Sequence, residues 1–171
     1  MTALPVTRSI RRKGTFSASP EATITLDYEA RMLRRKRLVT DDGFAIFVDL
    51  AETVSLDEGD CLALEDGRLV GVVAAPETVL AVTGDLPRLA WHIGNRHTPC
   101  QIGAGRLLIR EDHVLETMLR RLGAGVERAV LPFSPEGGAY GHGRTMGHDH
   151  GPAQGHGHGH SHGHGHGHGP V

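Results

Sequence analysis

The stretch TVLAVTGDLPRLAWHIGNRH, residues 78–97, decides the fold of the second half of this chain. Residues 78–83 are mostly apolar or β-branched and predict a buried strand. Asp85 follows as a good N-cap, and apolar residues then recur at helical spacing at Leu86, Leu89, Ala90 and Ile93. We expect Gly94 and Asn95 to end this helix in a tight turn. The stretch therefore predicts a strand joined to an amphipathic helix.

The residues that follow repeat this pattern. Short strands are expected at 99–102 and 106–109, on either side of the turn formed by residues 103–105. A second helix is expected over residues 112–122, because apolar side chains share one face and Gly123 stops it. A last strand is expected at 126–131. The order βαββαβ is ferredoxin-like, so we predict one α/β domain over residues 76–133.

The first half of the chain is predicted to consist of β-strands. Apolar runs at 23–26, 44–48, 61–64 and 69–73 predict strands, and turns with Asp and Gly separate them. We therefore expect a small β-barrel or sandwich as an amino-terminal domain over residues 1–75. Its first 20 residues are basic and rich in Ser, Thr and Pro, which predicts a loose start. Residues 75–77 mark the boundary between the two domains.

The last segment, residues 134–171, is predicted to be a disordered, flexible tail rich in Gly and His. Ten of the 13 histidines lie there. Imidazole binds nickel, zinc and copper, and intervening glycines let the backbone follow any coordination geometry. Asp149, Gln154 and Ser161 interrupt the alternation, which argues against a purification tag. The candidate ligands in the tail are His142, His148, His150, His156, His158, His160, His162, His164, His166 and His168.

Composition excludes several classes of protein. Residues 1–40 carry nine Lys or Arg against three Asp or Glu, and residues 41–75 carry one against nine. Adjacent basic and acidic surfaces with few aromatic residues favour protein docking over nucleic-acid binding. Two cysteines without a C-x-x-C spacing fit a reduced, cytoplasmic protein, and no apolar run is long enough for a membrane span. No catalytic motif is present, so we do not expect an enzyme.

Three histidines lie outside the tail and are candidate ligands. His97 follows the first helix on a short loop stiffened by Pro99, and a two-fold dimer would bring two copies of it together. His92 is expected to point outward from that helix, either without a metal or toward a partner. His113 is placed on the polar face of the second helix. Each of the three also has an interpretation as an ordinary surface residue.

Other polar residues near these histidines have simpler interpretations. Cys100 is expected to be a small buried thiol at the start of a strand, and Cys61 a core residue. Asp112 is expected to cap the second helix rather than bind a metal. The basic run at residues 34–37 is expected to be a solvated face, with docking to an acidic partner as the alternative.

Several blocks of this sequence resemble one known family. Residues 91–99, WHIGNRHTP, resemble the aromatic-His-x-Gly-Asn-Arg-His-x-Pro signature of the UreE family of urease accessory proteins. Residues 112–119, 131–140, 40–43 and 74–77 resemble its second helix, the segment before its histidine tail, its amino-terminal domain and its linker. The similarity spans about residues 22–171.

This resemblance implies a homodimeric nickel metallochaperone whose β-rich domain is similar to peptide-binding modules. His97 from each protomer would share a nickel ion at the dimer interface, and His113 would match a peripheral site. Some members have a His-x-His pair where this chain has Glu111-Asp112-His113, which weakens that site unless a carboxylate binds. The implied partners are the urease GTPase UreG, the other urease accessory proteins and apo-urease.

The implied mechanism is ligand exchange, in which the tail collects nickel and the His97 pair passes it on. Zinc and copper are competing ions. Because binding needs neutral imidazole, whose ordinary pKa is about 6.5, loading should fail as the solution turns acidic. Two alternatives stay open: a nickel or zinc buffer that uses only the tail, and an adaptor that binds a protein segment through its β domain.

Overall fold

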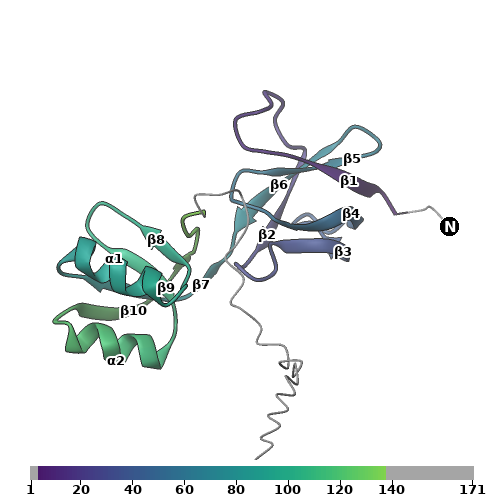
Figure 1. Ribbon diagram of the computed structural model, residues 1–171. Coiled ribbons are helices and arrows are strands. Elements are labelled where there is room, and N and C mark those ends of the chain that lie inside the picture. The colour runs from purple at the N-terminus through teal and green to yellow at the C-terminus, as the bar shows by residue number, and fades with distance from the viewer. Residues whose placement is uncertain (1–3, 138–171) are drawn as a thin grey trace, which may run out of the picture.

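The computed structural model describes residues 4–137, which form two sheets joined end to end (Figure 1). The predicted tail lies outside the described residues, apart from its first four positions. The first sheet holds β1 (Val6–Arg11), β2 (Ala22–Leu26), β3 (Met32–Val39), β4 (Ala45–Ser55), β5 (Cys61–Leu64) and β6 (Leu69–Ala74). The second unit holds β7 (Pro76–Thr83), α1 (Leu86–Asn95), β8 (Cys100–Ile102), β9 (Leu107–Arg110), α2 (His113–Arg121) and β10 (Gly125–Pro132).

The first sheet curls into a half-barrel around one apolar core. Its strand order is β2-β6-β5-β1-β4-β3, with β1 parallel to β4 and β2 parallel to β6. The two edges approach each other where the backbone N–H of Asp41 donates to the carbonyl of Thr23 at 2.8 Å. Of the two shapes predicted for this domain, the barrel therefore describes the observed sheet better than the sandwich does. Ile46, Val48, Leu62 and other fully buried aliphatic residues fill the interior.

The prediction that residues 1–20 are loose is wrong for residues 6–11. They form β1, which lies between β5 and β4 in the middle of the sheet. Few residues of this strand are apolar, so the pattern of apolar residues did not predict it. Its stability comes from pairing with β5 on one side and β4 on the other. Thr7 is fully buried, and its hydroxyl donates to the carbonyl of Ala63 at 2.8 Å.

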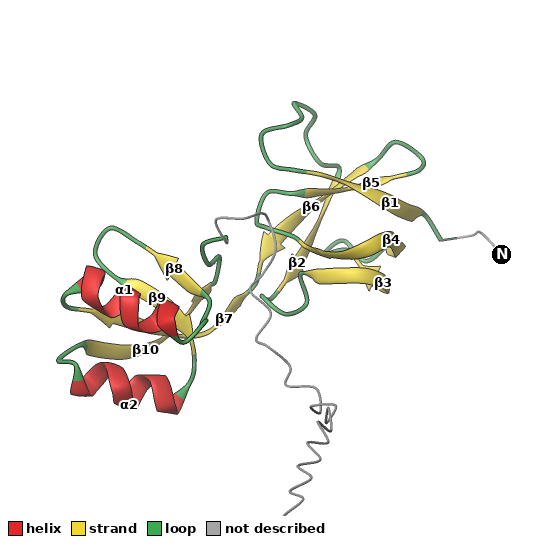
Figure 2. Ribbon diagram, in the orientation of Figure 1, coloured by secondary structure: helices red, strands yellow, loops and turns green. Residues whose placement is uncertain are grey.

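The second unit has the predicted element order, βαββαβ. Its strands are antiparallel throughout, in the order β10-β7-β9-β8. Alternation along β7 gives the sheet two apolar faces. Leu80 and Val82 pack under helices α1 and α2, whereas Val79 and Ala81 face the other way. Figure 2 shows the two helices on this unit and a half-barrel built only of strands and loops.

The second apolar face of this sheet is closed by residues from both halves of the chain. Tyr28, which follows β2, and Phe133, which follows β10, pack there edge to face with ring centroids 5.2 Å apart. Arg31 is 2% exposed and donates to the carbonyl of Phe133. The junction between the two units is therefore packed and includes a buried cation. Within residues 4–137, no helix is long and apolar enough to cross a membrane.

Candidate metal site

The end of α1 holds His97 in a backbone conformation that favours glycine. Its φ is 55°, and among residues 4–137 no other non-glycine residue has a positive φ. The N–H of His97 donates to the carbonyl of Gly94 at 2.9 Å, and the N–H of Thr98 donates to that of Ile93 at 3.4 Å. These two bonds define a Schellman motif, whose left-handed position is usually Gly. His97 therefore stands where helices normally place a glycine.

The helix ends at Asn95 as the sequence predicts, but the turn after it is formed by Arg96 and His97 and not by Gly94 and Asn95. Both residues are helical, and Arg96 is the C-cap. A side chain in the left-handed region costs about 1–2 kcal/mol, and such strain is concentrated at functional sites. The His97 side chain is exposed. The turn thus presents an imidazole from a rigid helix end, with its ring nitrogens open to a ligand.

His92 lies one turn earlier on α1 and is half-buried rather than fully outward. Its ring stands edge to face against Trp91, with centroids 5.0 Å apart and planes at 86°. Trp91 is 65% exposed, which is unusual for so large an apolar side chain. Exposed tryptophan is typical of surfaces that contact another protein. His92 therefore belongs to a candidate contact surface more than to a ligand set.

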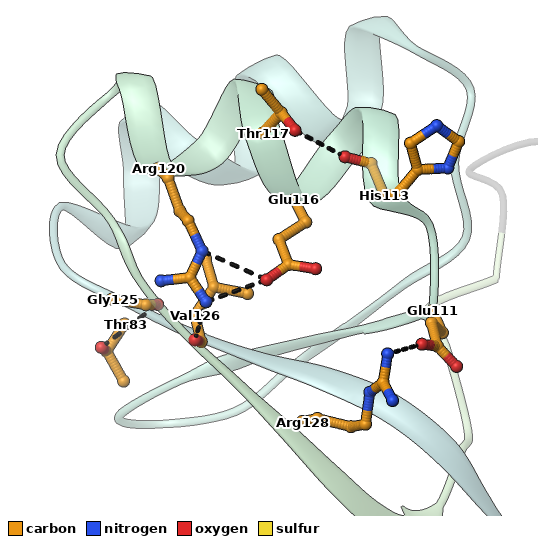
Figure 3. A network of polar contacts seen from close by, with 9 residues as sticks. All are labelled: Thr83, Glu111, His113, Glu116, Thr117, Arg120, Gly125, Val126 and Arg128. Carbon is orange, nitrogen blue, oxygen red and sulfur yellow. Dashed lines mark hydrogen bonds and ion pairs between the residues drawn. The ribbon is translucent and has the colours of Figure 1, made fainter.

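His113 opens helix α2 and is exposed, as the sequence predicts. Figure 3 shows its imidazole projecting from the start of the helix, away from Glu116, and its ring makes no drawn interaction. Two surface hollows of about 410 and 480 Å³ border this residue. The first is also lined by Arg96, next to His97 in the chain. The fold thus brings the end of α1 and the start of α2 to one side of the molecule.

The two carboxylates beside His113 are engaged elsewhere. Asp112 is the N-cap of α2, and its Oδ1 accepts from the N–H groups of Val114 and Leu115 at 2.8 and 3.0 Å. The capping prediction is confirmed. Glu111 forms an ion pair with Arg128 on β10 (Figure 3). A metal at His113 would have to break a cap or an ion pair to gain either carboxylate.

The two cysteines pack in or beside the apolar cores. Cys61 is buried, and burial raises the pKa of its thiol. Cys100 packs beside the core under the helices, where burial, helped by the charge of Glu136, raises the pKa of its thiol to about 11. A thiolate is the form that binds a metal, and burial disfavours it. Cys61 is the core residue that the sequence predicts, whereas Cys100 is only half-buried at the margin of its core.

No group of three or more His, Cys, Asp or Glu side chains within residues 4–137 is arranged to hold a metal ion. His97 and His113 are single exposed imidazoles on neighbouring elements, and the ten tail histidines lie outside the described residues. Arg96 and Arg121 border the hollow beside His113. Arg96 belongs to the signature at residues 91–99, whereas no sequence motif includes Arg121, which looks like an ordinary cation at a helix end. Any metal bound at His97 needs further ligands from another chain, the tail or solvent.

Comparison with known proteins covers both sheets. Residues 4–75 match the family model "UreE urease accessory protein, N-terminal domain", and residues 75–168 match the corresponding C-terminal domain. The chain is 61% identical to the urease accessory protein UreE of Cereibacter sphaeroides over 154 residues, which is 90% of this chain and 85% of the relative.

Two further relatives carry the same name. The UreE protein of Rhodobacter capsulatus is 69% identical over 75% of this chain and 83% of its own length. That of Ruegeria pomeroyi is 59% identical over 86% of this chain and 99% of its own length. The shared name describes an accessory protein of urease and not an enzyme, in agreement with the sequence. The matches extend over nearly the whole chain, which therefore belongs to the UreE family of urease accessory proteins.

Proposed function

We propose that this chain is a nickel metallochaperone that collects Ni(II) and delivers it, through the urease GTPase UreG, to apo-urease in the cytoplasm. Membership of a family of urease accessory proteins supports a role in urease nickel maturation. The left-handed backbone of His97 is the observation that supports a role for this residue in particular. An imidazole held there at a cost in stability has a use other than packing.

In the proposed mechanism two chains form a dimer with a two-fold axis near the end of α1. The axis would pair the two His97 imidazoles, because a two-fold interface brings each residue close to its own copy. The exposed indole of Trp91 gives that surface an apolar contact. Two imidazoles fill only part of the coordination sphere of nickel, so open positions remain for a receiving protein. Ligand exchange then needs no unfolding of the site.

The tail has a separate role in this proposal. Its ten histidines raise the local concentration of nickel beside the paired imidazoles. His113 serves as a weak peripheral ligand, because the nearby carboxylates are engaged in a cap and an ion pair. The domain limits 1–75, 76–133 and 134–171 remain predictions. A buffer that acts through the tail alone is the competing function.

A test compares two histidines on the same helix end. His97→Gly keeps the left-handed turn and removes the imidazole, whereas the control His92→Ala removes a histidine within α1 that is on the contact surface and is not proposed as a ligand. Calorimetric nickel titration should lose one ion per dimer in His97→Gly and none in His92→Ala. Urease activation at limiting nickel should fall only for His97→Gly. Unchanged activation in that variant would exclude delivery through His97.

Truncation to residues 1–141 separates the buffer hypothesis from delivery. The delivery proposal expects the truncated chain to keep one high-affinity nickel ion per dimer and to activate urease when nickel is abundant. The buffer hypothesis expects truncation to abolish activation while His97→Gly has no effect. Sedimentation analysis of each variant checks that dimer formation is intact. The same titrations with zinc and copper measure the selectivity of each site.

A further inference from the structure

Strand β3 forms one edge of the half-barrel and carries the basic run that the proposed function does not use. It lies at the end of the strand order and pairs only with β4 among the described residues. A bulge between Leu33 and Arg35 interrupts the ladder, after which residues 35–39 pair in regular register with β4. Within residues 4–137, no backbone hydrogen bond joins the other side of this five-residue segment to another element. An extended segment can hydrogen-bond to such an edge.

The edge is strongly cationic. Arg34, Arg35, Lys36 and Arg37 are all exposed. Arg35 reaches Asp49 at 2.7 Å but remains 71% exposed, whereas Arg34, Lys36 and Arg37 form no ion pair in the described part of the chain. Four consecutive cations on a strand point to both sides of the sheet. Any segment that pairs with this edge meets positive charge on both of its faces.

The strand is also held firmly in place. Leu33 and Leu38 are both buried in the half-barrel core although they lie five positions apart, an odd spacing. Alternation alone would put them on opposite faces, so the bulge restores the inward direction. Val39, at the end of the regular segment, is 51% exposed. The edge is therefore a rigid template with an apolar position at one end.

We propose that β3 binds an extended acidic segment of another protein as a seventh strand of the half-barrel. Backbone hydrogen bonds to residues 35–39 would give affinity, and acidic side chains facing the cations would give selectivity. A second copy of β3 is excluded as the occupant, because two such edges would juxtapose like charges. This site is remote in sequence from His97, so a test of it is independent of the proposal that His97 binds nickel.

The simpler explanation is that the charges only protect the edge from aggregation. A pair of peptides separates the two explanations. Fluorescein-labelled (Glu-Thr)4 carries four negative charges and can form a ladder, whereas (Glu-Pro)4 carries the same charge but lacks half of its N–H donors. Fluorescence anisotropy with the full-length chain should show tighter binding of (Glu-Thr)4. Binding should weaken as salt is raised.

Matched variants locate the site. The triple variant Arg34→Ala, Lys36→Ala, Arg37→Ala should weaken (Glu-Thr)4 binding about tenfold, the loss expected for three exposed ion pairs. The control Arg88→Ala, Arg106→Ala, Arg121→Ala removes the same charge from the second unit and should change binding by less than about twofold. Thermal unfolding checks that both variants are folded. Amide hydrogen exchange should slow at residues 35–39 when (Glu-Thr)4 binds.

Three results would overturn the proposal. Equal binding of the two peptides would mean that charge alone attracts them. An equal loss in both triple variants would mean that the attraction is spread over the whole surface. Failure of the full-length chain to bind (Glu-Thr)4 at low salt would leave the basic run as protection of a free edge.

Discussion

Substitution of His97 should separate the stability of this protein from its proposed function. The imidazole side chain stands at a left-handed position with a φ of 55°, inside a Schellman motif that any residue able to adopt this φ can form. A non-glycine residue loses about 1–2 kcal/mol there. Glycine avoids that cost but loses about 0.4–1 kcal/mol through the greater freedom of its unfolded chain. The difference between these two terms predicts that His97→Gly raises the free energy of unfolding by up to about 1.6 kcal/mol.

A series at this position gives a rank order that depends only on the backbone. Asn tolerates the left-handed region, so His97→Asn should leave stability unchanged within about 0.5 kcal/mol. Val is β-branched and should lower stability by about 1 kcal/mol or more. All three variants remove the imidazole and should lose the same nickel ion. Nickel binding and stability would then vary independently along the series.

The assay is guanidinium denaturation at one fixed protein concentration, because dimer formation would make stability depend on concentration. Each variant is paired with a calorimetric nickel titration in the folded state. If His97→Gly is less stable than the parent chain, or if His97→Val is as stable as His97→Gly, the backbone does not impose strain at this position. The argument from strain to function would then fail.

Three further predictions concern buried and capping groups. Arg31 is buried, and its Nε and Nη1 atoms have no hydrogen-bond partner among the described residues. Arg31→Met should therefore keep the free energy of unfolding within about 1 kcal/mol, whereas Arg31→Ala should lower it by about 3 kcal/mol because it leaves a cavity. Denaturant unfolding measures both variants, and equal losses would contradict the reasoning. Asp112→Ala should lower the free energy of unfolding by about 1 kcal/mol without changing the number of nickel ions bound. Asp112→Asn should retain most of the stability of the parent chain, because Asn is also a good N-cap. Loss of a nickel ion in either variant would instead make Asp112 a ligand. Hydrogen bonds from the Thr23 and Thr25 hydroxyls lower the pKa of Asp41. Its carboxylate therefore stabilises the fold above about pH 4, and this contribution is lost as the pH falls through the lowered pKa. Asp41→Asn should flatten the dependence of the free energy of unfolding on pH below about pH 4, and an unchanged dependence would refute this.

The second unit was predictable because its signals are local. The N-caps at Asp85 and Asp112 and the apolar stripe through Leu89 and Ile93 fix each helix within its own residues. The first strand of the half-barrel was not predictable. Residues 6–11 include few apolar side chains, and they form β1 because β4 and β5, distant in sequence, supply partners on both sides. Non-local pairing of this kind leaves little trace in the strand itself.

The sequence by itself determined the βαββαβ order, the histidine-rich end and the residues that carry the family signature, because periodicity, caps and composition depend only on near neighbours. Only the tertiary structure decided how those residues are presented. It placed the left-handed turn at His97 instead of Gly94, and it engaged Glu111 with Arg128. It also left the cationic strand β3 at an open edge of the half-barrel. Each of these outcomes depends on hydrogen bonds, charges and strand pairings that the packed backbone sets, which no local pattern records.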